Sequence, residues 1–144
     1  MEVNDLNKCL RGELSAIETY RQALDKNRQQ YANDAKFQQL TQMLRDHQDA
    51  AERLRECIQR MGGTPSTDSG AWGTWSQTVM GTAKLFGDKA ALKALKEGEE
   101  SGVKDYRDLL DDVSVPGDVK SLASSVLSRE QQHVQEIDRL MNSV

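Results

Sequence analysis

The chain has 144 residues, of which 29% are charged and 37% hydrophobic, and its net charge at neutral pH is −4. This length suits one domain, and the low aromatic content (5%) with only two prolines favours an all-α fold over a β-sheet. The acidic balance gives no electrostatic reason to bind nucleic acid or an anionic membrane, and the lack of a long apolar run or a basic leader predicts a cytoplasmic protein.

The N-terminal part predicts a helical hairpin over about residues 3–62. Apolar residues of the first helix recur in alternating steps of four and three, the spacing of a helix packed in a bundle, and Glu13 is the one charge on this inward stripe. A second helix follows the turn QQYAND with the same spacing, and His47 is its one polar inward residue. The pair Gly62 and Gly63 then predicts the end of this helix.

A crossover is predicted over about residues 63–87. Its first half is rich in Gly, Ser and Thr, and its second half could form a short extra helix. The segment is longer than a tight turn requires, as expected where a bundle of two hairpins needs one long connection. Trp72 and Trp75 concentrate apolar surface there, which indicates either a cover for the flank of the bundle or a homodimer contact.

The C-terminal part predicts a second hairpin over about residues 88–144. The inward stripe of its first helix carries Glu99. The last helix begins after Pro116, and its inward stripe carries Glu130 and His133. Each of the four predicted helices therefore places at least one acid or imidazole toward the interior.

The two hairpins resemble each other in sequence. The stretch GELSAIETYRQAL from Gly12 and the stretch GEESGVKDYRDLL from Gly98 share Gly, Glu, Ser, Tyr, Arg and Leu at an offset of 86 residues. The same offset relates His47 to His133, the two histidines of the chain. The sequence thus predicts one helical hairpin written twice.

The inward polar residues are predicted to share one layer. At about 1.5 Å per residue, Glu13 and His47 differ in height by roughly 6 Å, and the polar residues of the second hairpin lie within one helical turn of each other. Buried charges must be paired, bound to metal or neutralised by a proton. Two divalent ions would balance these carboxylates, and oxygen with imidazole ligands suits iron, manganese or zinc.

A metal-free alternative fits the same pattern. Protonated imidazoles could pair with Glu13 and Glu99, and Glu130 could stay neutral through a raised carboxyl pKa. The polar layer would then serve only to specify how the helices of the bundle associate.

The motifs resemble those of the ferritin-like superfamily of bacterioferritins and rubrerythrins. GELSAIETY is similar to the first-helix motif of that superfamily, and EQQH is similar to its fourth-helix motif. The likeness is greatest to a small bacterial family with the same Gly-Glu starts and a Gly-Gly-x-Pro exit, whose activity is not established. The resemblance implies a ferritin-like four-helix bundle with iron as cofactor, Glu13 and His47 on one metal, Glu99 and His133 on the other, and Glu130 as a bridge.

Some residues depart from or surround this pattern. Leu44 stands where the second-helix glutamate of the superfamily would be, so the implied di-metal site is incomplete. Asp46 and Asp49 lie about 100° and 200° around the helix from the inward stripe, and we expect them in solvent. Tyr20 and Tyr106 are expected to hydrogen-bond the polar layer, with redox partnership to a metal as the alternative.

Two functions therefore stand as hypotheses. The first is a ferritin-like protein with a partial di-metal site, which binds metal and takes part in oxidative-stress chemistry. The second is a non-catalytic helical bundle with a hydrogen-bonded polar core, which acts as a structural or interaction module.

Overall fold

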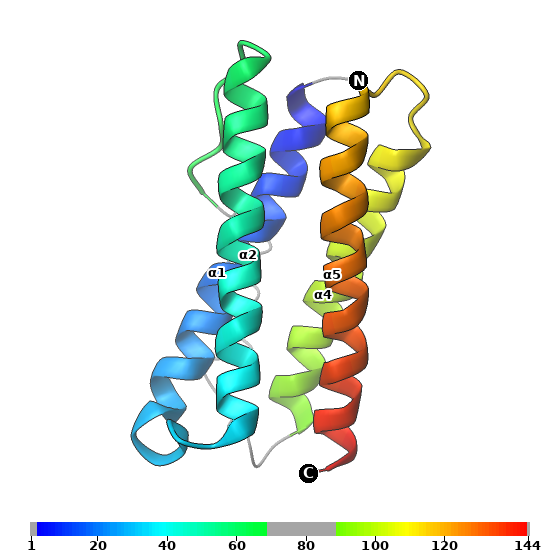
Figure 1. Cartoon of the computed structure of the whole chain (residues 1–144). Coiled ribbons are helices and arrows are strands. Elements are labelled where there is room, and N and C mark those ends of the chain that lie inside the picture. Colours follow the sequence, from blue (N-terminus) through cyan, green and yellow to red (C-terminus); the bar gives the residue numbers. More distant parts are fainter. Residues whose placement is uncertain (1–2, 69–88, 144) are drawn as a thin grey trace.

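The computed structural model describes residues 3–68 and 89–143 of the chain, and within these ranges it contains helices and no strand. The helices run along one common direction as a bundle, with the two chain ends at opposite ends of it (Figure 1). The predicted all-α four-helix bundle of two hairpins is confirmed. The helices are α1 (Val3–Tyr31), α2 (Ala35–Arg60), α4 (Lys89–Asp111) and α5 (Gly117–Asn142).

Local chemistry explains where α2 begins and ends. The side chain of Asp34 accepts a hydrogen bond from the backbone nitrogen of Lys36 at 2.8 Å, which caps the first turn of α2. At the other end, the backbone nitrogens of Gly62 and Gly63 each lie 3.0 Å from carbonyl oxygens of the last turn. Gly62 has a φ of +80°, as this type of helix end requires, so the predicted stop is confirmed.

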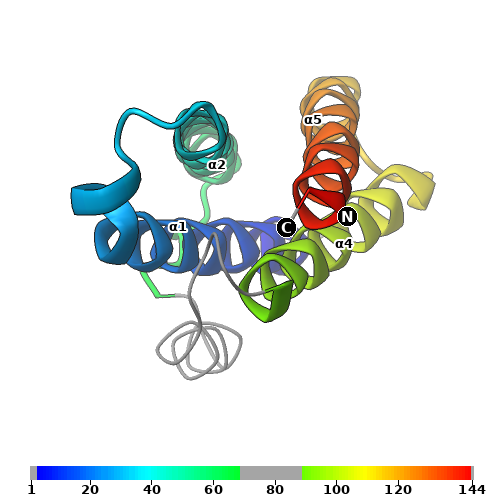
Figure 2. The ribbon, with the colours of Figure 1, turned by 90° about the horizontal axis from the view of Figure 1, so that it is seen from below.

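The two hairpins meet mainly through α1 and α4. Viewed from one end of the bundle (Figure 2), α1 and α4 lie side by side in one layer, with α2 and α5 on the same side of that layer and apart from each other. The interface between the hairpins is therefore formed mainly by α1 and α4.

The interior consists of two apolar clusters separated by a polar layer. One cluster lies toward the beginning of α1 and includes Leu10 and Leu54, and the other includes Leu24 and Leu95. Leu44 is half-buried and packs against both clusters, which places it at the level of the polar layer. The buried acids and imidazoles described below lie at this level.

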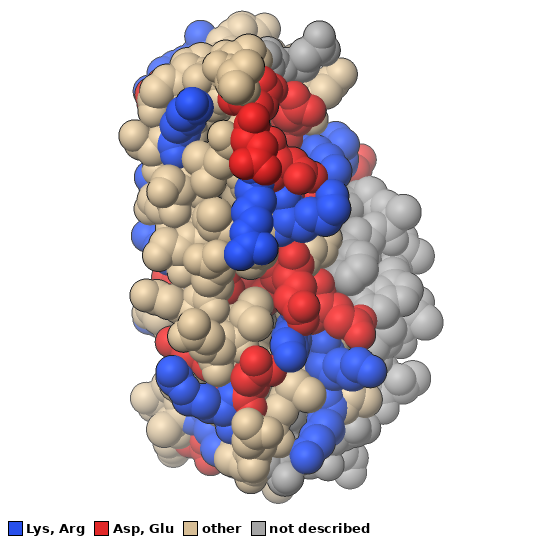
Figure 3. All heavy atoms as spheres, turned by 90° about the vertical axis from the view of Figure 1, so that its right-hand side faces the viewer, with Lys and Arg blue, Asp and Glu red and all other residues tan. Residues whose placement is uncertain are grey.

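The surface of α4 and α5 carries charges of both signs. On the face that Figure 3 shows, basic and acidic side chains alternate beside a broad uncharged band. Within these two helices, Lys96 and Asp138 form an ion pair of 2.8 Å, and Lys104 and Asp108 form one of 2.9 Å. Among the described helices, none is long and apolar enough to cross a membrane.

The predicted crossover falls mostly outside the described residues. Trp72 and Trp75, the predicted short extra helix and the predicted homodimer contact all lie in the undescribed range 69–88. These expectations therefore stay predictions.

Candidate metal centre

The structure brings all five predicted site residues together in the interior. Glu13 comes from α1, His47 from α2 and Glu99 from α4, while α5 supplies the other two. Each occupies the inward stripe of an amphipathic helix, which explains why a charged residue lies in the core. Their exposed fractions are 2% for Glu13, 3% for His47, 2% for Glu99, 3% for Glu130 and 4% for His133.

His47 lies between two carboxylates from different hairpins. Its Nδ1 is 2.6 Å from Oε2 of Glu13, and its Nε2 is 2.6 Å from Oε1 of Glu99. The resemblance assigned this imidazole to the Glu13 side alone. In the structure His47 therefore occupies the middle of the layer and contacts both halves of the site.

His133 is held by two carboxylates. Its Nδ1 lies 3.2 Å from Oε1 of Glu99, and its Nε2 lies 2.8 Å from Oδ2 of Asp46. The expectation that Asp46 points into solvent is wrong, because its side chain is only 24% exposed and contacts His133 on the neighbouring α5. Asp49 lies at the surface, with a side chain that is 51% exposed and 3.0 Å from Arg129.

The two tyrosines connect the hairpins. The hydroxyl of Tyr20 donates to Oε1 of Glu99 at 2.7 Å, and the hydroxyl of Tyr106 donates to Oε1 of Glu13 at 2.8 Å. Both bonds run between α1 and α4, and the 86-residue offset relates one to the other. The prediction that these hydroxyls hydrogen-bond the polar layer is confirmed.

Glu130 is packed against a glycine. A Cβ atom placed on Gly102 would overlap the carboxylate of Glu130, so α4 leaves room for this side chain only because position 102 is glycine. The Oε1 of Glu130 lies 3.9 Å from Nδ1 of His47. The periodicity of α4 does not reveal which side chain Gly102 accommodates.

Two carboxylate oxygens in this layer lack a hydrogen-bond partner among the described residues. They are Oε2 of Glu99 and Oε2 of Glu130. A buried oxygen of this kind costs free energy unless a proton or a cation compensates it. The residues present therefore fit a cation.

Burial and neighbouring charge move the pKa values of the layer in opposite directions. Burial alone would lower the pKa of His47, but Glu99 and Glu13 outweigh it and raise that pKa well above its usual value. Burial alone would raise the pKa of Glu99, but the charge of His47 and contacts with His133 lower it to about 2. Burial and the Glu13 carboxylate raise the pKa of Glu130 well above its usual range. Without metal, these shifts favour a neutral Glu130 carboxyl and a charged His47 imidazole.

Ligand atoms converge in two groups that share His47. In each group the candidate ligand atoms lie within 4.8 Å of one another. Imidazole nitrogens with carboxylate oxygens suit iron, manganese or zinc. The first group is Glu13, His47 and Glu130, and the second is His47, Glu99 and His133.

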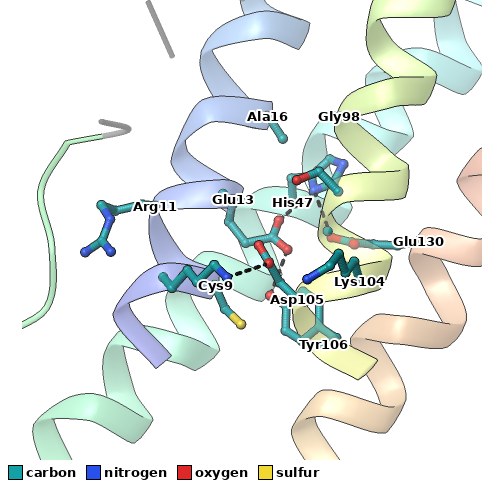
Figure 4. Close-up of a pocket in the computed structure, with 14 residues that line it drawn as sticks. Cys9, Arg11, Glu13, Ala16, His47, Gly98, Lys104, Asp105, Tyr106 and Glu130 are labelled. Atoms are coloured by element: carbon teal, nitrogen blue, oxygen red, sulfur yellow. Dashed lines mark hydrogen bonds and ion pairs between the residues drawn. The ribbon is translucent and has the colours of Figure 1, made fainter. Parts of the chain in front are cut away.

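A cavity of about 400 Å³ leads from solvent between α1 and α4 to the first group. Figure 4 shows Glu13, His47 and Glu130 gathered at the cavity, with Arg11 pointing away from them. Small residues, including Gly12 and Gly102, line its walls. The first group is thus the one that small ligands can reach.

Comparisons with known proteins agree with this architecture. The family described as "Domain of unknown function (DUF2383)" matches residues 1–112. A crystal structure described as that of ferritin-like, diiron-carboxylate proteins from Bacillus anthracis str. Ames has a TM-score of 0.68 at 23% identity, over 96% of this chain and 94% of that chain. At 23% identity, this likeness shows the fold alone. A search of curated proteins found no match. The chain belongs to the DUF2383 family and has the ferritin-like four-helix fold.

Proposed function

We propose that this protein binds a divalent transition metal, iron first, in the polar layer of its bundle. The observation that carries the proposal is the unpartnered Oε2 of Glu130, a buried carboxylate whose other oxygen, Oε1, lies 3.9 Å from Nδ1 of His47. A cation there would compensate this oxygen and replace the proton that Glu130 otherwise holds. The structural likeness to a protein described as a diiron-carboxylate protein supports the same reading.

The first ion is proposed to occupy the group of Glu13, His47 and Glu130. Glu99 and His133 would hold a second ion more weakly, because a neutral His47 imidazole has one nitrogen lone pair to offer and Leu44 supplies no carboxylate. Asp46 would orient His133 from outside, as carboxylates commonly do for metal-bound histidines. Bound iron would supply redox chemistry toward dioxygen or peroxide, which is the basis for proposing a role in oxidative stress.

Metal content and anaerobic titration test this proposal. Protein purified without chelator or affinity tag should take up about one Fe(II) per chain under anaerobic conditions, and its unfolding temperature should rise with the concentration of added metal. A content below about 0.1 metal per chain with no shift in unfolding temperature would refute metal binding.

A structural role is the second candidate, because the layer compensates much of its own charge. All four imidazole nitrogens lie within 3.2 Å of a carboxylate oxygen. Under this proposal the function lies on the surface or in the crossover, including a homodimer contact around Trp72 and Trp75. The variant Glu130→Gln separates the two, because the raised pKa of Glu130 already favours a neutral side chain when no metal is bound. If the role is structural, the variant and the wild type should be equally stable with and without metal. If the role is metal binding, added metal should stabilise the wild type and not the variant.

A further inference from the structure

The boundary between α1 and α4 contains two cavities at positions that the 86-residue offset relates. One has a volume of about 400 Å³ and the other of about 10 Å³. Each lies beside one of the tyrosine–glutamate pairs of the polar layer. The corresponding wall residues are Lys8 with Ala94, Cys9 with Leu95, Gly12 with Gly98, Asp105 with Thr19, and Tyr106 with Tyr20.

We call the cavity of about 400 Å³ open, because it has room for a ligand, and the cavity of about 10 Å³ closed, because it has room for no more than about one water molecule. Two of these correspondences distinguish them. Where the open cavity has Lys8 and Asp105, the closed one has Ala94 and Thr19, which are 7% and 6% exposed. The hydroxyl of Thr19 donates to the carbonyl of Ser15 at 2.8 Å within its own helix. At these two positions the closed side therefore offers no charged group to an incoming ion, whereas the open side offers the carboxylate of Asp105.

Asp105 lies at the mouth of the open cavity with an ammonium group beside it. The Nζ of Lys8 is 3.4 Å from Oδ1 of Asp105, and the two side chains are 58% and 14% exposed. Two further cationic side chains line the same wall. Arg11 donates to Oγ of Ser66 at 3.2 Å, and Lys104 pairs with Asp108 at 2.9 Å.

The inner and outer surroundings of Asp105 both favour a cation. On the inside, Glu130 lines the cavity, is 3% exposed, and presents the unpartnered Oε2 described above. On the outside, an adjoining cavity of about 230 Å³ shares Lys8, Cys9 and Asp105 with the open one. Its other walls include Asp5, Asp108 and Asp112. A divalent cation would thus meet carboxylate oxygens on its way in and, beyond them, a buried oxygen that lacks a partner.

We propose that Asp105 is the transient ligand through which a divalent cation passes from solvent to Glu130 and Glu13. The Lys8 ammonium neutralises Asp105 while no cation is present, and a doubly charged ion displaces it. The corresponding position on the other side, Thr19, takes no part in uptake. This inference rests on the proposed metal-binding function and adds the route by which the metal ion enters the site.

The test measures the rate of Co(II) uptake separately from the amount bound. Stopped-flow absorbance of Co(II) mixed with full-length metal-free protein gives the rate, and equilibrium dialysis gives the ions bound per chain. Asp105→Asn should slow uptake about tenfold, the lower end of electrostatic effects on association rates, while the amount bound at saturation stays that of the wild type. Thr19→Val, the matched change on the closed side, should leave the rate unchanged. Lys8→Met should speed uptake.

The outcomes separate this inference from the proposed function. If the wild type binds Co(II) and Asp105→Asn takes it up equally fast, the route is wrong and the metal site stands. If Thr19→Val slows uptake as much as Asp105→Asn does, the asymmetry argument is wrong. Loss of bound Co(II) at equilibrium in Asp105→Asn would make Asp105 a permanent ligand and overturn the transient role. A wild type that binds no Co(II) overturns both proposals.

Discussion

The substitution Gly102→Ala tests the link between the backbone of α4 and the candidate metal centre. A methyl group at this position would overlap the carboxylate of Glu130. Gly12→Ala is a matched control on α1, because its added Cβ would lie 3.8 Å from Oδ2 of Asp105, an ordinary contact distance. Both changes replace a glycine inside a helix by alanine.

The expected magnitudes follow from these contacts. Alanine in place of glycine inside a helix stabilises by about 0.5–1 kcal/mol, and Gly12→Ala should gain this amount. Overpacking costs about 1–3 kcal/mol, and the lower end applies at Gly102 because the end of a glutamate side chain can move into the adjoining cavity. Gly102→Ala should therefore be about 1 kcal/mol less stable than Gly12→Ala.

The larger effect is expected on metal binding. A displaced Glu130 leaves the group that it forms with Glu13 and His47, so Gly102→Ala should bind Co(II) at least about tenfold more weakly, while Gly12→Ala should match the wild type. Urea unfolding in chelator measures the stabilities, and Co(II) titration with a competing chelator measures the affinities. Equal stability and equal affinity in the two variants would refute the reasoning.

Three further predictions concern the polar layer. Asp46→Asn should weaken binding of the second Co(II) about tenfold, because Asp46 orients His133, whereas the surface control Asp49→Asn should have no effect in the same titration. The pKa of His47 is raised, so its contribution to stability is complete below the usual value of 6.5 and is lost as pH rises. The pKa of Glu99 is lowered, so its contribution is present above the usual value of 4.5 and is lost as pH falls toward about 2. Urea unfolding of the metal-free protein should therefore show a decline on both sides, and a free energy of unfolding that stays constant from neutral to alkaline pH would contradict the His47 assignment. Leu44→Glu should tighten binding of a second Co(II), read as a higher stoichiometry at equilibrium, and unchanged stoichiometry would mean that position 44 does not face the metals.

The sequence by itself determined the helices and the residues that face inward. A spacing of three and four residues fixes which side of a helix is buried, and Glu13, His47 and Glu99 broke that apolar stripe visibly. The end of α2 could also be predicted from the sequence, because Gly62 and Gly63 can adopt a backbone conformation that is unfavourable for other residues. These features depend on residues that are close together in the sequence, so the sequence alone is enough to predict them.

Tertiary structure decided which of those side chains touch. Three contacts depend on how far each helix is rotated and how closely it approaches its neighbour. They are the position of His47 between two carboxylates, the contact of Asp46 with His133, and the packing of Glu130 against Gly102. Periodicity gives a face of a helix about 100° wide and does not say which helix that face meets. For the same reason, the sequence did not predict the difference in volume between the two cavities at the boundary of α1 and α4, because side chains from both helices determine that volume.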